Sequence, residues 1–75
     1  MNEPKLNHNI KYILDICLIS APKSCPYVND SIEITYSNSE KQYFTHKNDN
    51  PNDLNYDFES HKELKDYFDK IQKQL

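Results

Sequence analysis

Residues 60–75 carry the pattern that most restricts how this chain folds, because their apolar side chains recur with the period of an α-helix. Ser60 and Glu63 have the spacing of a capping box, in which each side chain accepts a hydrogen bond from a backbone N–H of the first turn. We therefore predict a C-terminal amphipathic helix in 60–75. Its apolar side consists of Leu64, Tyr67, Phe68, Ile71 and Leu75. Such a helix needs a second layer of structure to cover that side.

A β-hairpin is predicted for residues 31–46. Apolar and polar side chains alternate along 31–36, and 41–46 follows the turn-forming run Ser37-Asn38-Ser39-Glu40. The chain contains no glycine, so we expect Asn38 to take the left-handed backbone conformation in an Asn38-Ser39 loop. The cross-strand pairs are then Ile34 with Tyr43 and Ile32 with Thr45, whereas a three-residue loop pairs Ile34 with Phe44.

Residues 10–19 fit both a strand and a helix. A period of two gives an apolar face of Ile10, Tyr12, Leu14, Ile16 and Leu18. A helical period gives a stripe of Ile10, Ile13, Leu14, Cys17 and Leu18. The abundance of isoleucine favours the strand.

These segments predict one small α+β domain over residues 1–75. It consists of an antiparallel sheet of about three strands, with the C-terminal helix packed on one face. The alternative order is α-β-β-α, if 10–19 is helical. Residues 1–9 are expected to be mobile or loosely docked. Residues 47–59 form an acidic loop rich in Asn and Asp, part of which is expected to add a short extended segment to the sheet edge.

The absence of glycine excludes the glycine-dependent motifs of the common nucleotide-binding and hydrolase folds. No run of about 18 apolar residues is present, and Asp15 interrupts the longest apolar stretch, which argues against a membrane span or a signal peptide. We expect a cytoplasmic protein with no cofactor. All nine basic residues are lysines and the net charge is −3, which disfavours direct binding of nucleic acid.

The cysteines and histidines show no metal-binding or catalytic spacing. Cys17 and Cys25 do not form a CxxC pair, and we expect both thiols to be reduced. His8, His46 and His61 are far apart in sequence, and no HxH or HxxxH pair is present. No metal site is therefore predicted, and a small cysteine hydrolase using Cys17 or Cys25 is only a residual hypothesis.

Charge is the one property that is unevenly distributed. Residues 1–47 have no net charge, whereas 48–69 contain seven carboxylates and two lysines, a net charge of −5. Acidic groups interleaved with aromatic side chains suit the capture of a basic protein surface. The candidate partner-binding residues are Asp49, Asp53, Tyr56, Asp57, Phe58, Glu59, Glu63 and Asp66. The simpler interpretation is that these acids only solvate a helix and the turn that leads into it.

The sequence therefore predicts a non-enzymatic, stoichiometric protein-binding factor whose partner has a basic surface, such as a nucleic-acid-binding protein. The bias toward Asn, Lys, Ile and Tyr is typical of AT-rich coding sequence, and it suggests a small phage or mobile-element inhibitor of the anti-defence, immunity or antitoxin type. The alternative is a structural module that forms a homodimer through a sheet edge and has no separate target.

Overall fold

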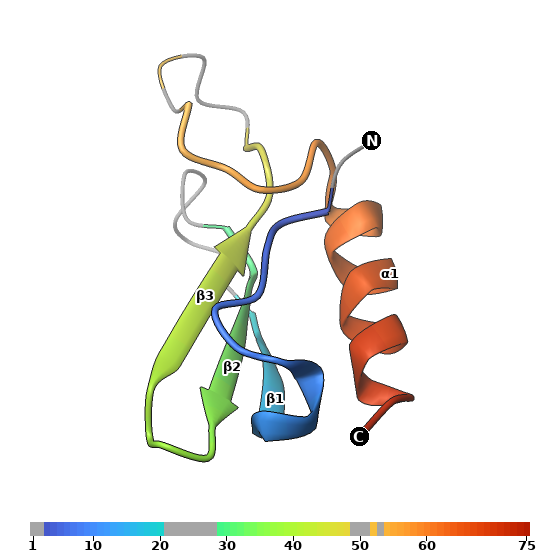
Figure 1. Cartoon of the computed structure of the whole chain (residues 1–75). Helices are drawn as coiled ribbons and strands as arrows, with labels where there is room; N and C mark the ends of the chain where they lie inside the picture. The colour runs from blue at the N-terminus through green and yellow to red at the C-terminus, as the bar shows by residue number, and fades with distance from the viewer. Residues whose placement is uncertain (1–2, 21–28, 49–51, 53) are drawn as a thin grey trace.

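The computed structural model describes residues 3–20, 29–48, 52 and 54–75. A short 3-10 turn, Ile10–Tyr12, leads into strand β1, Ile13–Ile19. Strands β2, Ser31–Tyr36, and β3, Lys41–Thr45, form a hairpin, and helix α1, His61–Gln72, follows. The sheet is antiparallel with the order β1-β2-β3, and α1 lies along one of its faces (Figure 1). The predicted α+β fold is confirmed, with a strand and not a helix in the segment 10–19.

A β-bulge in β1 changes which side chains of this strand enter the core. The predicted apolar face included Tyr12 and Leu14, but Leu14 is the extra residue of the bulge and is 68% exposed. Tyr12 is also exposed, because it belongs to the turn that precedes the strand. The bulge brings Ile13 onto the same buried side as Ile16, which a regular alternation does not allow.

The hairpin has a register that neither predicted alternative described. Ile34 lies opposite Gln42, and Ile32 lies opposite Phe44. Tyr36 N donates a hydrogen bond to Glu40 O at 2.9 Å, which closes a three-residue loop over 37–39. This register places Phe44 on the core side, and a shift by one residue would have moved it to the opposite face.

Ser39, and not Asn38 as predicted, has the left-handed backbone conformation, with φ of 72°. Asn38 contributes through its side chain, because its Oδ1 accepts a hydrogen bond from Glu40 N at 2.9 Å. A three-residue loop of this kind commonly consists of a turn followed by one left-handed residue. Ser39 therefore has the left-handed conformation that glycine has in many hairpins, and the side chain of Asn38 stabilises the loop through its hydrogen bond.

The core lies between the sheet and α1. Aromatic rings fill its centre: Phe44 contacts Tyr67 with ring centroids 5.8 Å apart, and Phe58 contacts Tyr67 at 5.3 Å. Leu75 was predicted on the apolar side of the helix, but α1 ends at Gln72 and Leu75 is exposed. The buried apolar residues are Ile13, Ile16, Ile32, Ile34, Tyr36, Phe44, Phe58, Leu64, Tyr67 and Ile71.

The end of the acidic loop joins the sheet at the outer edge of β3. His46 and Phe58 form a parallel bridge, and Lys47 N donates to Phe58 O at 2.8 Å. The expected extended segment at the sheet edge is therefore present at Phe58. It fixes the position of the chain just before α1 begins.

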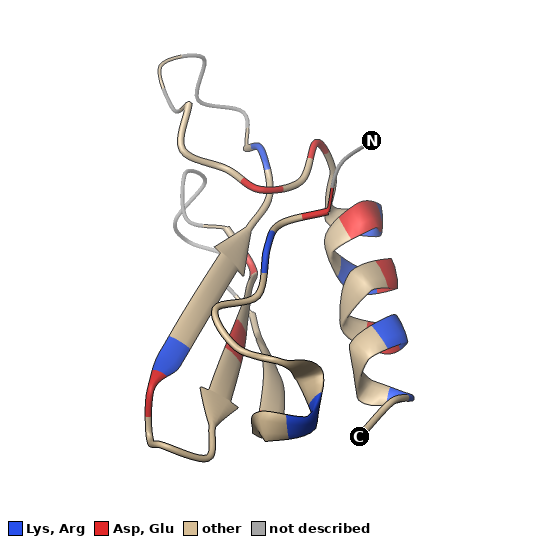
Figure 2. Ribbon diagram, viewed as in Figure 1, with Lys and Arg blue, Asp and Glu red and all other residues tan. Residues whose placement is uncertain are grey.

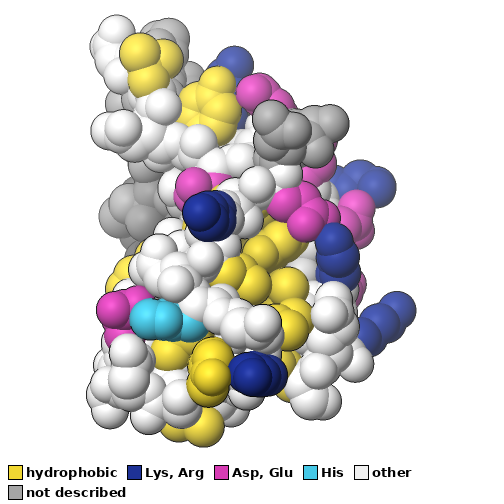
Figure 3. All heavy atoms as spheres, viewed as in Figure 1, with side chains coloured by type: hydrophobic (Ala, Val, Ile, Leu, Met, Phe, Trp, Pro, Cys, Tyr) yellow, Lys and Arg dark blue, Asp and Glu magenta, His cyan; other side chains and the backbone are white. Residues whose placement is uncertain are grey.

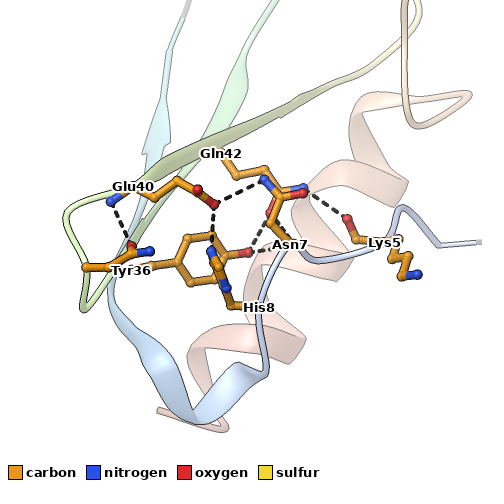
Figure 4. A network of polar contacts seen from close by, with 7 residues as sticks. Lys5, Asn7, His8, Tyr36, Glu40 and Gln42 are labelled. Carbon is orange, nitrogen blue, oxygen red and sulfur yellow. Dashed lines mark hydrogen bonds and ion pairs between the residues drawn. The ribbon is translucent and has the colours of Figure 1, made fainter.

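The N-terminal segment packs on the same side of the sheet as α1 (Figure 1). Asn7 N donates to Tyr36 Oη at 3.2 Å and to Gln42 Oε1 at 3.0 Å, and Gln42 Nε2 donates to Lys5 O at 2.9 Å (Figure 4). Glu40 Oε2 lies 2.7 Å from His8 Nε2 in the same network. That residues 1–9 are mobile or loosely docked stays a prediction, and no local pattern in the sequence indicated these contacts with the hairpin.

Candidate functional site

The start of α1 holds two of the predicted acidic residues in place. Ser60 Oγ accepts a hydrogen bond from Glu63 N at 3.3 Å, as the capping box predicts. The return bond runs from Glu59 N to Glu63 Oε2 at 2.9 Å, one residue before the position expected for it. The carboxylate of Glu63 is thus fixed over the first turn, and the exposed Glu59 lies beside it.

Three other predicted residues are integrated into the fold. Asp57 Oδ2 accepts a hydrogen bond from Thr45 N at 3.0 Å and so satisfies a backbone group at the edge of β3. Phe58 is only 3% exposed and lies in the core, so its ring offers no free surface for a partner to grip. Tyr56 is half-buried. Asp49 and Asp53 lie outside the described residues.

Glu3 joins the acidic residues at the start of α1, although sequence analysis did not single it out. Lys70 Nζ lies 2.8 Å from Glu3 Oε1 and 3.0 Å from Oε2. The two residues are 67 positions apart, and no local pattern marks either as the partner of the other. Only the path of the N-terminal segment brings Glu3 to the helix.

We call the carboxylates of Glu3, Glu59, Glu63 and Asp66 the acidic face. Figure 2 shows acidic positions gathered around the first turns of α1 and the adjoining chain, and Figure 3 shows their side chains on one surface with lysines among them. Lys62 Nζ lies 3.1 Å from Asp66 Oδ2, and Lys70 pairs with Glu3. Since two lysines oppose four carboxylates, the face has a negative charge in excess.

A cavity of about 250 Å³ opens in this face. Phe58 and Tyr67 contribute aromatic rings to its wall, and charged side chains from the N-terminal segment and α1 surround them. The charged lining residues are Glu3, Glu63, Asp66 and Lys70. Apolar rings and carboxylates therefore line the same hollow.

Tyr67 is the most perturbed group of this cavity. Burial is the largest cause that raises its pKa to about 12, and the nearby negative charge of Glu3 contributes to the same rise. The phenol consequently stays neutral at physiological pH. A neutral Tyr67 is a hydrogen-bond donor as well as an acceptor.

The exposed Cys17 lacks the surroundings of an activated nucleophile. Its Sγ donates to Asp15 Oδ2 at 3.5 Å, and this hydrogen bond and the charge of Asp15 raise the pKa of the thiol. A raised pKa lowers the fraction of reactive thiolate at neutral pH. Cys25 lies outside the described residues.

Tertiary structure brings two histidines together that sequence analysis treated as separate. The rings of His46 and His61 lie 5.3 Å apart, and His61 Nε2 is 2.7 Å from Asp30 Oδ2. Within the described part of the chain, no group of three or more His, Cys, Asp or Glu residues is arranged to hold a metal ion.

No known protein family, curated protein or solved structure matches this chain. Among the described residues, no helix has the length and apolar character needed to cross a membrane.

Proposed function

We propose that this chain is a non-enzymatic, stoichiometric protein-binding factor that uses its acidic face against a basic surface of its partner. The observation that supports this proposal is the convergence of Glu3, Glu63 and Asp66 around one cavity, from segments at opposite ends of the chain. A concentration of one charge accelerates the encounter with an oppositely charged surface and fixes its orientation.

The proposed class is the small phage or mobile-element inhibitor of the anti-defence, immunity or antitoxin type, acting in the cytoplasm. The excess of acidic groups near α1 suits a protein that blocks a basic, nucleic-acid-binding surface. In this role the chain competes with nucleic acid for the partner and does not itself contact nucleic acid.

The test is affinity capture from a native extract of the organism that encodes the chain, at low and at high salt. The bait is compared with the variant Glu59→Gln/Glu63→Gln/Asp66→Asn, which removes three charges. Glutamine is accepted in a capping box, so the first turn of α1 is expected to remain intact. We expect the wild type to retain a basic protein at low salt, and the variant to associate with that protein more slowly and with a weaker dependence on salt.

A matched control removes three charges elsewhere, as Asp15→Asn/Glu33→Gln/Asp69→Asn. Asp15 and Glu33 lie on the sheet, and Asp69 lies on α1 but does not line the cavity. The control should capture the same protein as the wild type. Equal capture by all three baits at every salt concentration would refute the role of the acidic face.

The second candidate function is self-association through β1, and two observations favour it. Among the described residues β1 pairs with β2 alone, so its outer edge is open, and Leu14 and Ile19 are exposed on this strand. This hypothesis predicts a dimer whose mass in light scattering rises with protein concentration. A monomeric mass over the whole concentration range excludes it.

A further inference from the structure

The wall of the cavity in the acidic face includes Tyr67, a largely buried tyrosine. Tyr67 is 5% exposed and lines the cavity, and no described residue forms a hydrogen bond with its hydroxyl. All fully enclosed side-chain polar atoms of the described residues have partners, so the Tyr67 oxygen is not fully enclosed. A hydroxyl that is accessible and not bonded within the protein is free to bond to a ligand, as donor or acceptor.

The chain's own Lys70 indicates which chemistry the cavity favours. Lys70 lines the cavity and its ammonium group is bonded to both carboxylate oxygens of Glu3. Asp66 and Glu63 contribute two more carboxylates to the lining. Asp66 is also paired with Lys62, whose Nζ lies 3.1 Å from Asp66 Oδ2. Two ammonium groups therefore oppose the three carboxylates of the lining, which leaves one negative charge in excess.

The size of the cavity selects for a small ligand group. Sites for drug-sized ligands and cofactors usually enclose about 300–1,000 Å³. At about 250 Å³ this cavity lies below that range, and it is open to solvent along the acidic face. One long side chain of a partner protein fits this description better than a free cofactor.

We infer that the cavity binds one arginine side chain of the basic partner. Its guanidinium group replaces the Lys70 ammonium group as the hydrogen-bond partner of Glu3, and it also bonds to Asp66 and to the Tyr67 hydroxyl. This inference rests on the proposed function, because the arginine belongs to the same basic surface.

Arginine is favoured over lysine because the cavity offers several acceptors at once. A lysine of the partner would repeat the contact that Lys70 already makes with Glu3. A guanidinium group has five N–H donors in a planar fork, and so it can bond to two carboxylates and a hydroxyl together. The chain contains no arginine, so none of its own residues makes this contact.

The experiment is an NMR titration of the full chain with N-acetylarginine amide. The corresponding lysine amide and the uncharged citrulline amide are the comparison probes. We expect saturable shifts in the ring signals of Tyr67 and Phe58, arginine binding about two- to fivefold tighter than lysine, and no saturable binding of citrulline. Shifts spread over all surface carboxylates, with arginine equal to lysine, would overturn the inference.

Variants of the cavity sharpen the test. Asp66→Asn and Tyr67→Phe should each weaken arginine binding by a factor of about two to five, and Lys70→Gln should strengthen it by a similar factor, since the competing ammonium group is removed. The matched control Asp69→Asn removes the same charge from α1 at a residue that does not line the cavity. Equal affinities of Asp66→Asn and Asp69→Asn would refute the site.

The inference and the proposed function fail in different ways. Glu59→Gln changes the acidic face but not the cavity, whereas Tyr67→Phe changes the cavity but not the charge. If partner capture depends on Glu59 while arginine does not bind in the cavity, the inference is wrong and the proposed function stands. If arginine binds as expected but no basic protein is captured, the proposed function is wrong and the cavity is a guanidinium site of another role.

Discussion

Tyr67 links the core to the candidate site. Its ring packs against Phe44 and Phe58, with centroid distances of 5.8 Å and 5.3 Å, and the same residue lines the cavity together with Glu3. One side chain therefore stabilises the fold and contributes a polar atom to the surface. The pKa of its hydroxyl reflects both roles, because burial in the core and the charge of Glu3 at the cavity both raise it.

The raised pKa of Tyr67 predicts a loss of stability at high pH. The folded value is about 12, whereas an unperturbed tyrosine has a pKa of 10.0. The unfolded state therefore loses this proton first, so the contribution of Tyr67 to stability is complete below pH 10.0 and falls as the pH rises to about 12. We expect denaturant unfolding of the wild type to show a steeper decline over this range than that of Tyr67→Phe. Parallel declines in the two proteins would show that the phenol of Tyr67 titrates normally.

At the scale of the elements, small irregularities decide which side chains are buried. The bulge at Leu14 and the three-residue loop over 37–39 each shift a strand by one position relative to the simplest pattern. Because side chains alternate across a strand, such a shift exchanges its buried and exposed faces. Phe44 is in the core and Tyr43 on the open face for this reason.

The hairpin loop gives a direct test of this register. Ser39→Gly should stabilise the protein by about 0.5–1 kcal/mol, since glycine takes the left-handed conformation of Ser39 without steric cost. Asn38→Gly should destabilise it, because the hydrogen bond from Glu40 N to the Asn38 side chain is lost. Both changes are measured by urea unfolding. The opposite order would support the sequence-based prediction that Asn38 is the left-handed residue.

In the loop before α1, Phe58 is buried in the core whereas Leu54 is exposed. Phe58→Ala should cost about 3–5 kcal/mol, because it empties a buried aromatic position of the core. Leu54 is 79% exposed, so Leu54→Ala should change stability by less than about 0.5 kcal/mol. If Phe58→Ala does not fold, Phe58→Leu provides a milder measurement. If Leu54→Ala and Phe58→Leu changed the free energy of unfolding in urea by similar amounts, the buried position of Phe58 would be contradicted.

At the scale of the whole molecule, the N-terminal segment connects the hairpin to the helix. Asn7 is bonded to Tyr36 and Gln42, and Glu3 is bonded to Lys70. The first residues of the described chain thus contact residues that lie up to 67 positions away. The acidic face depends on this docking, because Glu3 reaches it only through the segment.

This docking predicts that the Asn7 amide is protected from hydrogen exchange. Tyr36→Phe removes one of its two acceptors, and should speed exchange at Asn7 and lower stability by about 1 kcal/mol. Tyr43→Phe is the matched control, because its hydroxyl bonds to Glu33 on the open face of the sheet. If the segment is mobile, the Asn7 amide will exchange at the rate of an unfolded chain in all three proteins.

Local patterns predicted much of the fold, but only part of the site. The capping residues and apolar spacing of 60–75 placed the helix, and alternation placed the strands of the hairpin. Glu63 and Asp66 were found from the charge run in which they lie. Glu3 was not identified as a site residue, because only the path of the chain in space brings it to α1. Tyr67 and Lys70 share a face of α1 with Glu63 and Asp66 through their spacing, but that spacing does not show that a cavity opens there.

The sequence by itself determined which segments become strands and a helix and where negative charge is concentrated, because short-range periodicity and composition fix these properties. The tertiary structure alone decided the strand register, the burial of Phe58, and the cavity at which Glu3 meets α1. These features depend on contacts between distant segments. Such contacts form only when the sheet, the helix and the N-terminal segment pack together, and no single segment encodes them.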